Sequence, residues 1–224
     1  MFYDPVGRFE PEVEDHQPVR LQALAEAKRW WETRPLYLDT ETTGLGDQAE
    51  VLEIGIVDHD GRVLLDQLIK PIGKISEGAR EVHGITEEML ACAPRWGEVH
   101  DQIYSILKDR AIVIYNYAFD TRIIDQTVSY HWFIKDWIDW PPPRCAMKLY
   151  ARFQGSWNDY YGNYAWHKLT AAASQLGIEV ENSHRAVDDA RVTRKLIKKL
   201  AQLHENPDKE IKQGIKIKKG WLPG

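Results

Sequence analysis

Hydrophobic positions along the chain change from a helical to a strand spacing and back. Residues 1–18 show no regular pattern, but from Val19 to Arg34 apolar residues recur every three or four positions, which predicts an amphipathic helix. The segment LYLDTE at 36–41 predicts a strand. Residues 51–70, VLEIGIVDHDGRVLLDQLIK, predict a β-hairpin, because two apolar runs flank a His-Asp-Gly turn.

Helices and strands alternate in the rest of the chain. The patterns predict a short helix at ITEEML, a helix at 96–109, a strand at 111–116, a helix from 119 towards 133, a strand at 144–146 and helices at 147–153, 165–176 and 185–204. Three strands connected through a hairpin and followed by alternating elements indicate one mixed sheet with helices packed on it. The predicted fold class is therefore α/β.

Composition limits the class of protein. The 224 residues suffice for one well-buried domain, and the hydrophobic share of 43% and charged share of 28% are typical of globular proteins. Cys92 and Cys145 lie far apart without a CxxC pair, which argues against a disulfide framework or a structural zinc site. Because no leader-like or membrane-length apolar segment is present, we expect a cytoplasmic protein without a membrane partner.

The formal net charge of the chain is −5 at pH 7. A protein that holds nucleic-acid backbone without specificity usually carries a basic face, so the net charge counts mildly against that class. The C-terminal residues 205–224 are basic nonetheless. They form either a solvated end or a weak attraction for a polyanion.

Two acids stand inside the first predicted strand. Side chains two residues apart on a strand point to the same face, so Asp39 and Glu41 share a face with Tyr37, and Leu36 and Leu38 fill the other. Neighbouring carboxylates repel each other and are costly to bury unpaired. A divalent cation would resolve both problems, although singly the first acid could cap a turn and the second could pair with a lysine.

Another acid follows the strand at 111–116. Asn116, Phe119 and Asp120 come at or just after its carboxyl end, which is the edge where ligands bind in open α/β sheets. Taken alone, Asp120 could instead cap the following helix, where aspartate is favoured. The segment is therefore a candidate part of the same site.

Helix geometry distinguishes two adjacent acids near the start of the last helix. At about 100° per residue, Asp189 lies at the edge of the apolar stripe and faces the sheet, while Asp188 points away from it. The same phase would turn His184 outward if the helix included it, so we expect His184 in the preceding loop. Asp189 is the expected ligand, and Asp188 is expected at the surface.

Together these segments resemble the three motifs of the DnaQ-like, or DEDDh, 3′–5′ exonucleases. The matches are Asp39-x-Glu41, Asn116-x-x-Phe119-Asp120 and His184-x-Ala186-x-x-Asp189, with VHGITEEML at 82–90 as an intervening element. The resemblance covers about residues 36–200. It implies a ribonuclease H-like, five-stranded mixed sheet flanked by helices, and release of nucleoside 5′-monophosphates from a 3′ end.

The resemblance also implies roles for these residues. The four acids Asp39, Glu41, Asp120 and Asp189 would hold two Mg²⁺ or Mn²⁺ ions, for which oxygen ligands without a Cys or His pair are suited. His184 would be the general base toward the attacking water, because an imidazole has an ordinary pKa of about 6.5. Two such ions about 3.5–4 Å apart can hold both the attacking and the leaving oxygen.

A pocket for the terminal nucleotide is implied as well. Its expected residues are Thr40, Thr42, Leu45, Val82, His83, Ile85, Asn116 and Phe119. Tyr115 and Tyr117 depart from the His-Asn-Ala that usually surrounds this asparagine, and we expect the departure to affect the pocket rather than the metal site. In WNDYYGNYAW, at 157–166, we expect a loop whose rings either pack, which is the favoured interpretation, or stack on bases.

The expected function is a metal-dependent 3′–5′ exonuclease that trims or proofreads single-stranded DNA ends. An RNA-trimming enzyme of the ribonuclease T or oligoribonuclease kind is the alternative, since DNA and RNA members share these motifs. A non-catalytic nucleic-acid-binding scaffold is the second alternative. The expected regions are an N-terminal extension at 1–34, an exonuclease domain at 35–204 and a basic tail at 205–224. Both ends are candidates for contact with a polymerase, a repair partner or a second copy.

Overall fold

The computed structural model describes residues 16–131, 143–180 and 184–205. Residues 1–15 of the N-terminal extension and nearly all of the basic tail lie outside these residues. In chain order the elements are α1 (Gln17–Glu32), β1 (Leu36–Thr42), β2 (Val51–Val57), β3 (Val63–Leu68), α2 (Glu77–His83), α3 (Trp96–Leu107), β4 (Ile112–Ile114), α4 (Tyr117–Tyr130), β5 (Arg144–Cys145), α5 (Ala146–Gln154), β6 (Trp157–Asn158), β7 (Asn163–Tyr164), α6 (Leu169–Gln175) and α7 (Ala186–Glu205).

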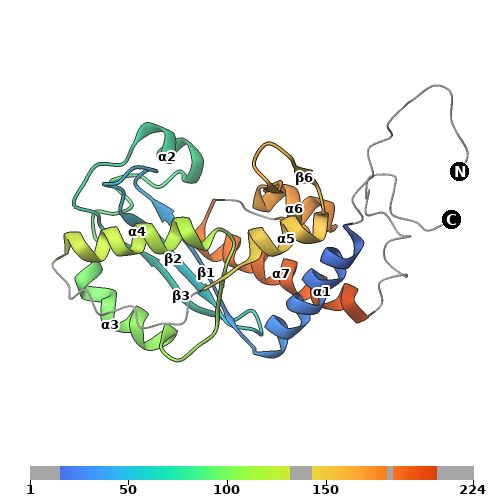
Figure 1. Ribbon diagram of the computed structural model, residues 1–224. Helices are drawn as coiled ribbons and strands as arrows, with labels where there is room; N and C mark the ends of the chain where they lie inside the picture. The colour runs from blue at the N-terminus through green and yellow to red at the C-terminus, as the bar shows by residue number, and fades with distance from the viewer. Residues whose placement is uncertain (1–15, 132–142, 181–183, 206–224) are drawn as a thin grey trace, which may run out of the picture.

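Five strands form the main sheet, in the order β3-β2-β1-β4-β5 (Figure 1). β2 runs antiparallel to β1 and β3, whereas β4 runs parallel to β1 and β5. In the β1–β2 pair Asp39 lies opposite Gly55 and Glu41 opposite Glu53, and the register shifts just after Glu41. The α/β class and the five-stranded mixed sheet are confirmed.

The sheet has helices on both faces (Figure 1). Leu36 and Leu38 pack in the hydrophobic cluster formed with α3 and α4, and Tyr37 packs in the cluster formed with α1, α5, α6 and α7. The alternation expected along the first strand is therefore confirmed. It leaves Asp39 and Glu41 on the α7 side of the sheet.

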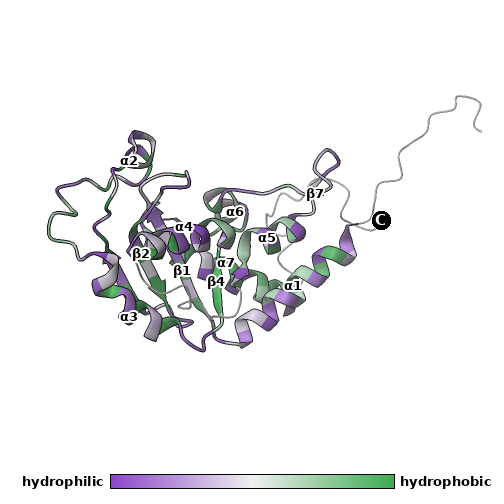
Figure 2. Cartoon of the chain, turned by 60° about the vertical axis from the view of Figure 1, so that its left-hand side comes forward, coloured by the Kyte–Doolittle hydropathy of each residue, from purple (hydrophilic) through white to green (hydrophobic). Residues whose placement is uncertain are grey.

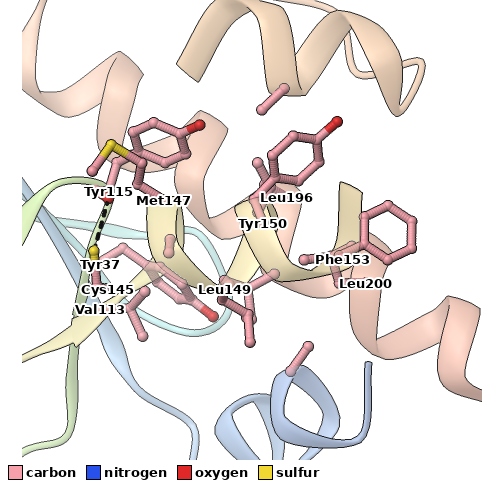
Figure 3. Close-up of a cluster of buried hydrophobic side chains, with 14 of the residues drawn as sticks. Tyr37, Val113, Tyr115, Cys145, Met147, Leu149, Tyr150, Phe153, Leu196 and Leu200 are labelled. Carbon is pink, nitrogen blue, oxygen red and sulfur yellow. Dashed lines mark hydrogen bonds between the residues drawn. The ribbon is translucent and has the colours of Figure 1, made fainter. Parts of the chain in front are cut away.

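The larger cluster explains why α5 and α7 lie where they do. Tyr37 and Val113 from neighbouring strands meet Leu149 and Tyr150 of α5 and Leu196 of α7 (Figure 3). Strand β4 is coloured as hydrophobic where it crosses the centre of the sheet (Figure 2). Each fully buried leucine contributes about 1.5–3 kcal/mol of hydrophobic free energy, so this cluster holds α7 firmly against β1.

One predicted helix is wrong and another was missed. Residues 85–90 form no helix, because Ile85 and Leu90 are buried in a small cluster with turns between them. The helix α2 instead precedes them. The Ser76 hydroxyl accepts a hydrogen bond from the Ala79 N–H at its start, and Gly84 ends it with φ of +68°.

Two other helices differ in their bounds. The helix expected at 165–176 is reduced to α6, and residues 165–168 connect the β6–β7 hairpin to it without helix or strand. The helix α1 begins and ends two residues earlier than the predicted first helix. It buries Ala23, Leu24 and Ala27, while Leu21 is exposed. In the described part of the chain no helix has the length and apolarity to cross a membrane.

Candidate active site

Three carboxylates from two elements converge at the carboxyl end of β1. Asp39 and Glu41 from the strand and Asp189 from α7 each offer a ligand oxygen, and these oxygens lie within 4.8 Å of one another. The Oδ1 of Asp189 is buried and has no hydrogen-bond partner among the described residues. Converging oxygens, one of them unpartnered, fit a hard divalent cation.

Because these carboxyls lie close together away from water, their pKa values are raised. Burial, followed by the charges of Asp120 and Asp189, raises the pKa of Asp39 well above its usual range. Burial and the neighbouring acids raise the pKa of Glu41 to about 8. Burial also raises the pKa of Asp189. A cation among these carboxylates would supply the positive charge that the site lacks.

Asp120 comes from α4, and after burial its charge contributes to the raised pKa of Asp39. It is buried in the first turn of α4, and one carboxylate oxygen accepts hydrogen bonds from the Thr40 N–H (3.1 Å) and hydroxyl (2.8 Å). Burial raises the pKa of Asp120 to about 7, and the bonds from Thr40 act in the opposite direction. Because Asn116 occupies the N-cap position, Asp120 is not the capping residue of α4.

The loop before α7 carries His184. The helix begins at Ala186, so the expected loop position of His184 is confirmed. His184 is exposed and has a φ of +66°, a left-handed conformation that costs a non-glycine residue about 1–2 kcal/mol. Its N–H donates to Asp189 Oδ2 at 3.3 Å. As the helix phase predicted, Asp188 points to the surface, where it pairs with Arg191 at 2.9 Å.

A fifth acid near the site was missed in the sequence. Glu53 of β2 is fully buried and accepts hydrogen bonds from Arg185, at 3.0 Å from Nε, and from the Ala186 N–H at 2.9 Å. Two residues on, a Cβ at Gly55 would lie 2.3 Å from the Val187 nitrogen. β2 thus provides the surface on which the first turn of α7 packs. The signal was a glutamate and a glycine inside an otherwise apolar run.

The expected pocket residues divide into exposed and buried ones. Leu45 and Val82 expose apolar side chains, and Arg122 donates to the Leu45 carbonyl at 3.1 Å while lying over the half-buried Phe119 ring. Asn116 is exposed, and its side chain forms no capping hydrogen bond. These side chains are available to contact a substrate.

The remaining pocket residues make contacts within the protein. Thr40 donates to Asp120, and the Thr42 hydroxyl donates to the Gly44 carbonyl at 2.8 Å. Ile85 is fully buried. In this conformation these three residues position neighbouring segments, and their contact with a nucleotide stays a prediction.

The buried imidazole of His83 joins two of these segments. Its Nδ1 accepts from the Ile85 N–H at 2.9 Å, so Nε2 carries the proton and donates to the Thr42 carbonyl at 3.2 Å. Burial lowers the pKa of His83, which favours the neutral ring that this pair of bonds requires.

Comparison with protein families and relatives matches the chain to exonucleases. A family model described as an exonuclease, of the RNase T type, matches residues 36–197. The exonuclease CP81 of Escherichia phage 186 is 41% identical over 180 residues, which are 79% of this chain and 92% of that protein. The DNA polymerase III subunit epsilon of Treponema pallidum is 29% identical, over 74% of this chain and 75% of the subunit.

The PolC-type DNA polymerase III of Thermotoga maritima is 31% identical over 201 residues, but the match spans only 13% of that polymerase. Among solved structures, Exonuclease X in complex with 5′ overhanging duplex DNA covers 77% of this chain and 92% of its own. Its TM-score is 0.53 and its identity 25%. A 3′-exonuclease that recognises the histone mRNA stem-loop has a TM-score of 0.57 at 16% identity, over 75% of this chain and 64% of that one, and shows the fold alone.

Proposed function

Because the chain belongs to the RNase T exonuclease family and is a 3′–5′ exonuclease, we propose that it releases nucleoside 5′-monophosphates from single-stranded DNA ends with two metal ions. The observation that carries the proposal is the convergence of Asp39, Glu41 and Asp189, with Asp120 and His184 beside them.

Metal dependence is general in this family, and the donor set favours Mg²⁺ or Mn²⁺. Asp39, Glu41 and Asp189 would hold one ion, and Asp39 with Asp120 the other. Their oxygens are hard ligands, and burial has raised the pKa of each of these carboxyls. When bound, such ions neutralise charge on the phosphodiester and lower the pKa of the attacking water.

The protein's own side chains supply the proton transfer and the grip on the strand. A neutral His184 imidazole takes the proton from the attacking water, while the hydrogen bond from the backbone N–H of His184 to Asp189 keeps the loop beside the carboxylates. Leu45, Val82 and Phe119 contact the apolar faces of the terminal nucleotide and keep solvent from its 3′ end. The buried Thr40 and His83 hold the segments that carry these groups.

The preference for DNA rests on the relatives. Two are named as DNA polymerase components, and Exonuclease X was solved with DNA. The same names make a polymerase or repair protein the proposed partner, with residues 1–34 and 205–224 as candidate contacts because they lie mostly outside the family match. A homodimer is the alternative assembly. RNA trimming remains the alternative activity.

One competition assay tests the function. DNA and RNA strands of identical sequence, each 5′-labelled with a different dye, are mixed with the enzyme and Mg²⁺, and the products are separated by chromatography. We expect the DNA to shorten from its 3′ end with release of deoxynucleoside 5′-monophosphates. Faster loss of the RNA would establish the alternative. In a parallel reaction His184→Ala should lose at least a hundredfold in kcat.

A further inference from the structure

The β6–β7 hairpin separates its aromatic rings into two groups. Trp157 and Tyr164 are cross-strand partners whose rings pack edge to face at 5.0 Å, with His16 stacked against Trp157. Tyr160 and Tyr161 at the turn, and Trp166 just after the hairpin, are instead 87%, 70% and 61% exposed. The favoured expectation of packing is therefore wrong for these three rings.

The exposed rings are held on a well-defined turn. The side-chain Oδ1 of Asn158 accepts from the N–H groups of Tyr160 (3.1 Å) and Tyr161 (3.2 Å), and Gly162, with φ of +61°, donates from its N–H to the Asn158 carbonyl. The two tyrosine rings lie edge to face, 4.8 Å apart. Exposed aromatic rings that the backbone holds in place lose little entropy on binding, so they are suited to a ligand.

The hairpin is attached to the segment that carries Asp120. Tyr115, which directly precedes Asn116, donates its hydroxyl to the His167 carbonyl at 2.8 Å, and the ring of His167 packs edge to face on Tyr150. Tyr115 is buried, so its departure from the family motif serves this attachment rather than a nucleotide contact. Figures 1 and 2 show the hairpin rising on the side toward which the carboxyl end of β1 points.

Positive charge accompanies the rings. A hollow of about 490 Å³ between α1, α5 and the hairpin is lined by Lys148, Arg152 and Trp166 among others. The ammonium of Lys148 lies over the ring of Tyr117, 5.8 Å from its centroid, and Lys168 is exposed next to the hairpin. Glu26, which also lines the hollow, forms an ion pair with Arg152.

We propose that Tyr160, Tyr161 and Trp166, with Lys148 and Lys168, form a docking surface for the single-stranded nucleic acid upstream of the 3′-terminal nucleotide. Rings of this kind stack on bases of any sequence, and lysines attract the phosphates between them. Interleaved rings and cations fit a nucleic-acid strand better than a purely apolar protein partner. The inference rests on the proposed function, since it requires a substrate strand that extends from the site.

Strand length provides the test. The probes are the p-nitrophenyl ester of thymidine 5′-monophosphate, which has no upstream strand, and oligothymidylates of 3 and 15 nucleotides. For Tyr160→Ala/Tyr161→Ala we expect a rise in KM for the 15-mer of about fivefold or more per ring, with kcat and hydrolysis of the ester unchanged. In EDTA, the Kd for a dye-labelled 15-mer should rise equally. The double phenylalanine variant should restore both, because it keeps the rings.

Controls separate the possible failures. Tyr104→Ala removes an exposed tyrosine from α3 and should leave every constant unchanged. Lys148→Gln should reduce the dependence of log Kd on log salt by about 0.7. If the wild type shortens the 15-mer but the double alanine variant keeps the wild-type KM and Kd, the docking surface is refuted. A change in the oligomeric state of the double alanine variant would refute it as well, because the rings would then serve assembly. A wild type that shortens no strand would refute the proposed function, and with it this inference.

Discussion

Glu53→Gln is the substitution that most sharply tests how α7 is positioned. The wild-type carboxylate is fully buried and accepts from the Arg185 guanidinium and from the Ala186 N–H. The amide keeps the volume but loses the charge, and its NH₂ faces donors rather than acceptors. The first turn of α7 therefore loses its attachment to β2, although no residue of the proposed metal site changes.

The size of the effect follows from exposure. Hydrogen bonds to a charged group contribute about 1.5–3 kcal/mol each, but the Arg185 side chain is 41% exposed, so water replaces part of what it loses. We expect a loss of about 2–4 kcal/mol in the free energy of unfolding, because the buried Ala186 N–H has no such replacement. For a chain of 224 residues this corresponds to a fall in Tm of roughly 5–15 °C.

The assay combines thermal unfolding with steady-state kinetics at a temperature where the variant is folded. A misplacement of about 1 Å can cost about a hundredfold in rate, so kcat should fall at least tenfold as His184 and Asp189 move. Glu87→Gln is the matched control, since its pairing with Arg80 is at the surface and contributes about 0–1 kcal/mol. If Glu53→Gln lost stability but kept the wild-type kcat, the contact between β2 and α7 would only stabilise the fold, and the reasoning on positioning would be refuted.

Three further predictions follow from the same geometry. Asp189→Asn should abolish metal-dependent cleavage, because Asp189 faces the carboxylate group. Asp188→Asn should reduce stability by at most about 1 kcal/mol and leave most of the activity, because Asp188 only pairs with Arg191 at the surface. A nuclease assay of both variants checks this, and the reverse outcome would overturn the assignment. Gly55→Ala should cost about 3 kcal/mol or more in chemical denaturation, since its Cβ would overlap the α7 backbone; an unchanged midpoint would contradict the close approach. Because burial raises the pKa of Glu41 to about 8, this residue should contribute most to the stability of the metal-free protein below about pH 4.3, the unfolded pKa of a glutamate, and this contribution should be lost as the pH rises to 8. Mg²⁺ should therefore raise the Tm more at pH 8.5 than at pH 5.5; a pH-independent shift in calorimetry would argue against it.

Local patterns predicted much of this molecule, for physical reasons. The alternation in LYLDTET requires opposite faces for successive side chains, and the structure places Leu38 and Tyr37 in different clusters accordingly. The apolar stripe of the last helix likewise predicted the burial of Ala190 and Leu200 and the outward direction of Asp188. The strand satisfies its period of two by packing on both faces, and the helix satisfies its period by packing one apolar face.

The parts that could not be predicted depend on contacts distant in sequence. Glu53 has its role only because Arg185, more than a hundred residues later, reaches it. Thr40 was expected to contact the nucleotide, and its bonds to Asp120 of α4, eighty residues later, could not be predicted. The hairpin that carries Tyr160 is followed by His167, whose carbonyl accepts from the distant Tyr115. A single strand or helix contains no information on such partners.

The most direct test of the account is a time course with a 5′-labelled single strand, run with the wild type and with Asp39→Asn at saturating Mg²⁺. Asp39 is half-buried among the carboxylates, and an amide supplies no negative charge to a cation. We expect the wild type to produce a ladder that shortens from the 3′ end and stops on addition of EDTA, and the variant to leave the strand intact. An Asp39→Asn variant that produced the same ladder at the wild-type rate would contradict the assignment of the active site.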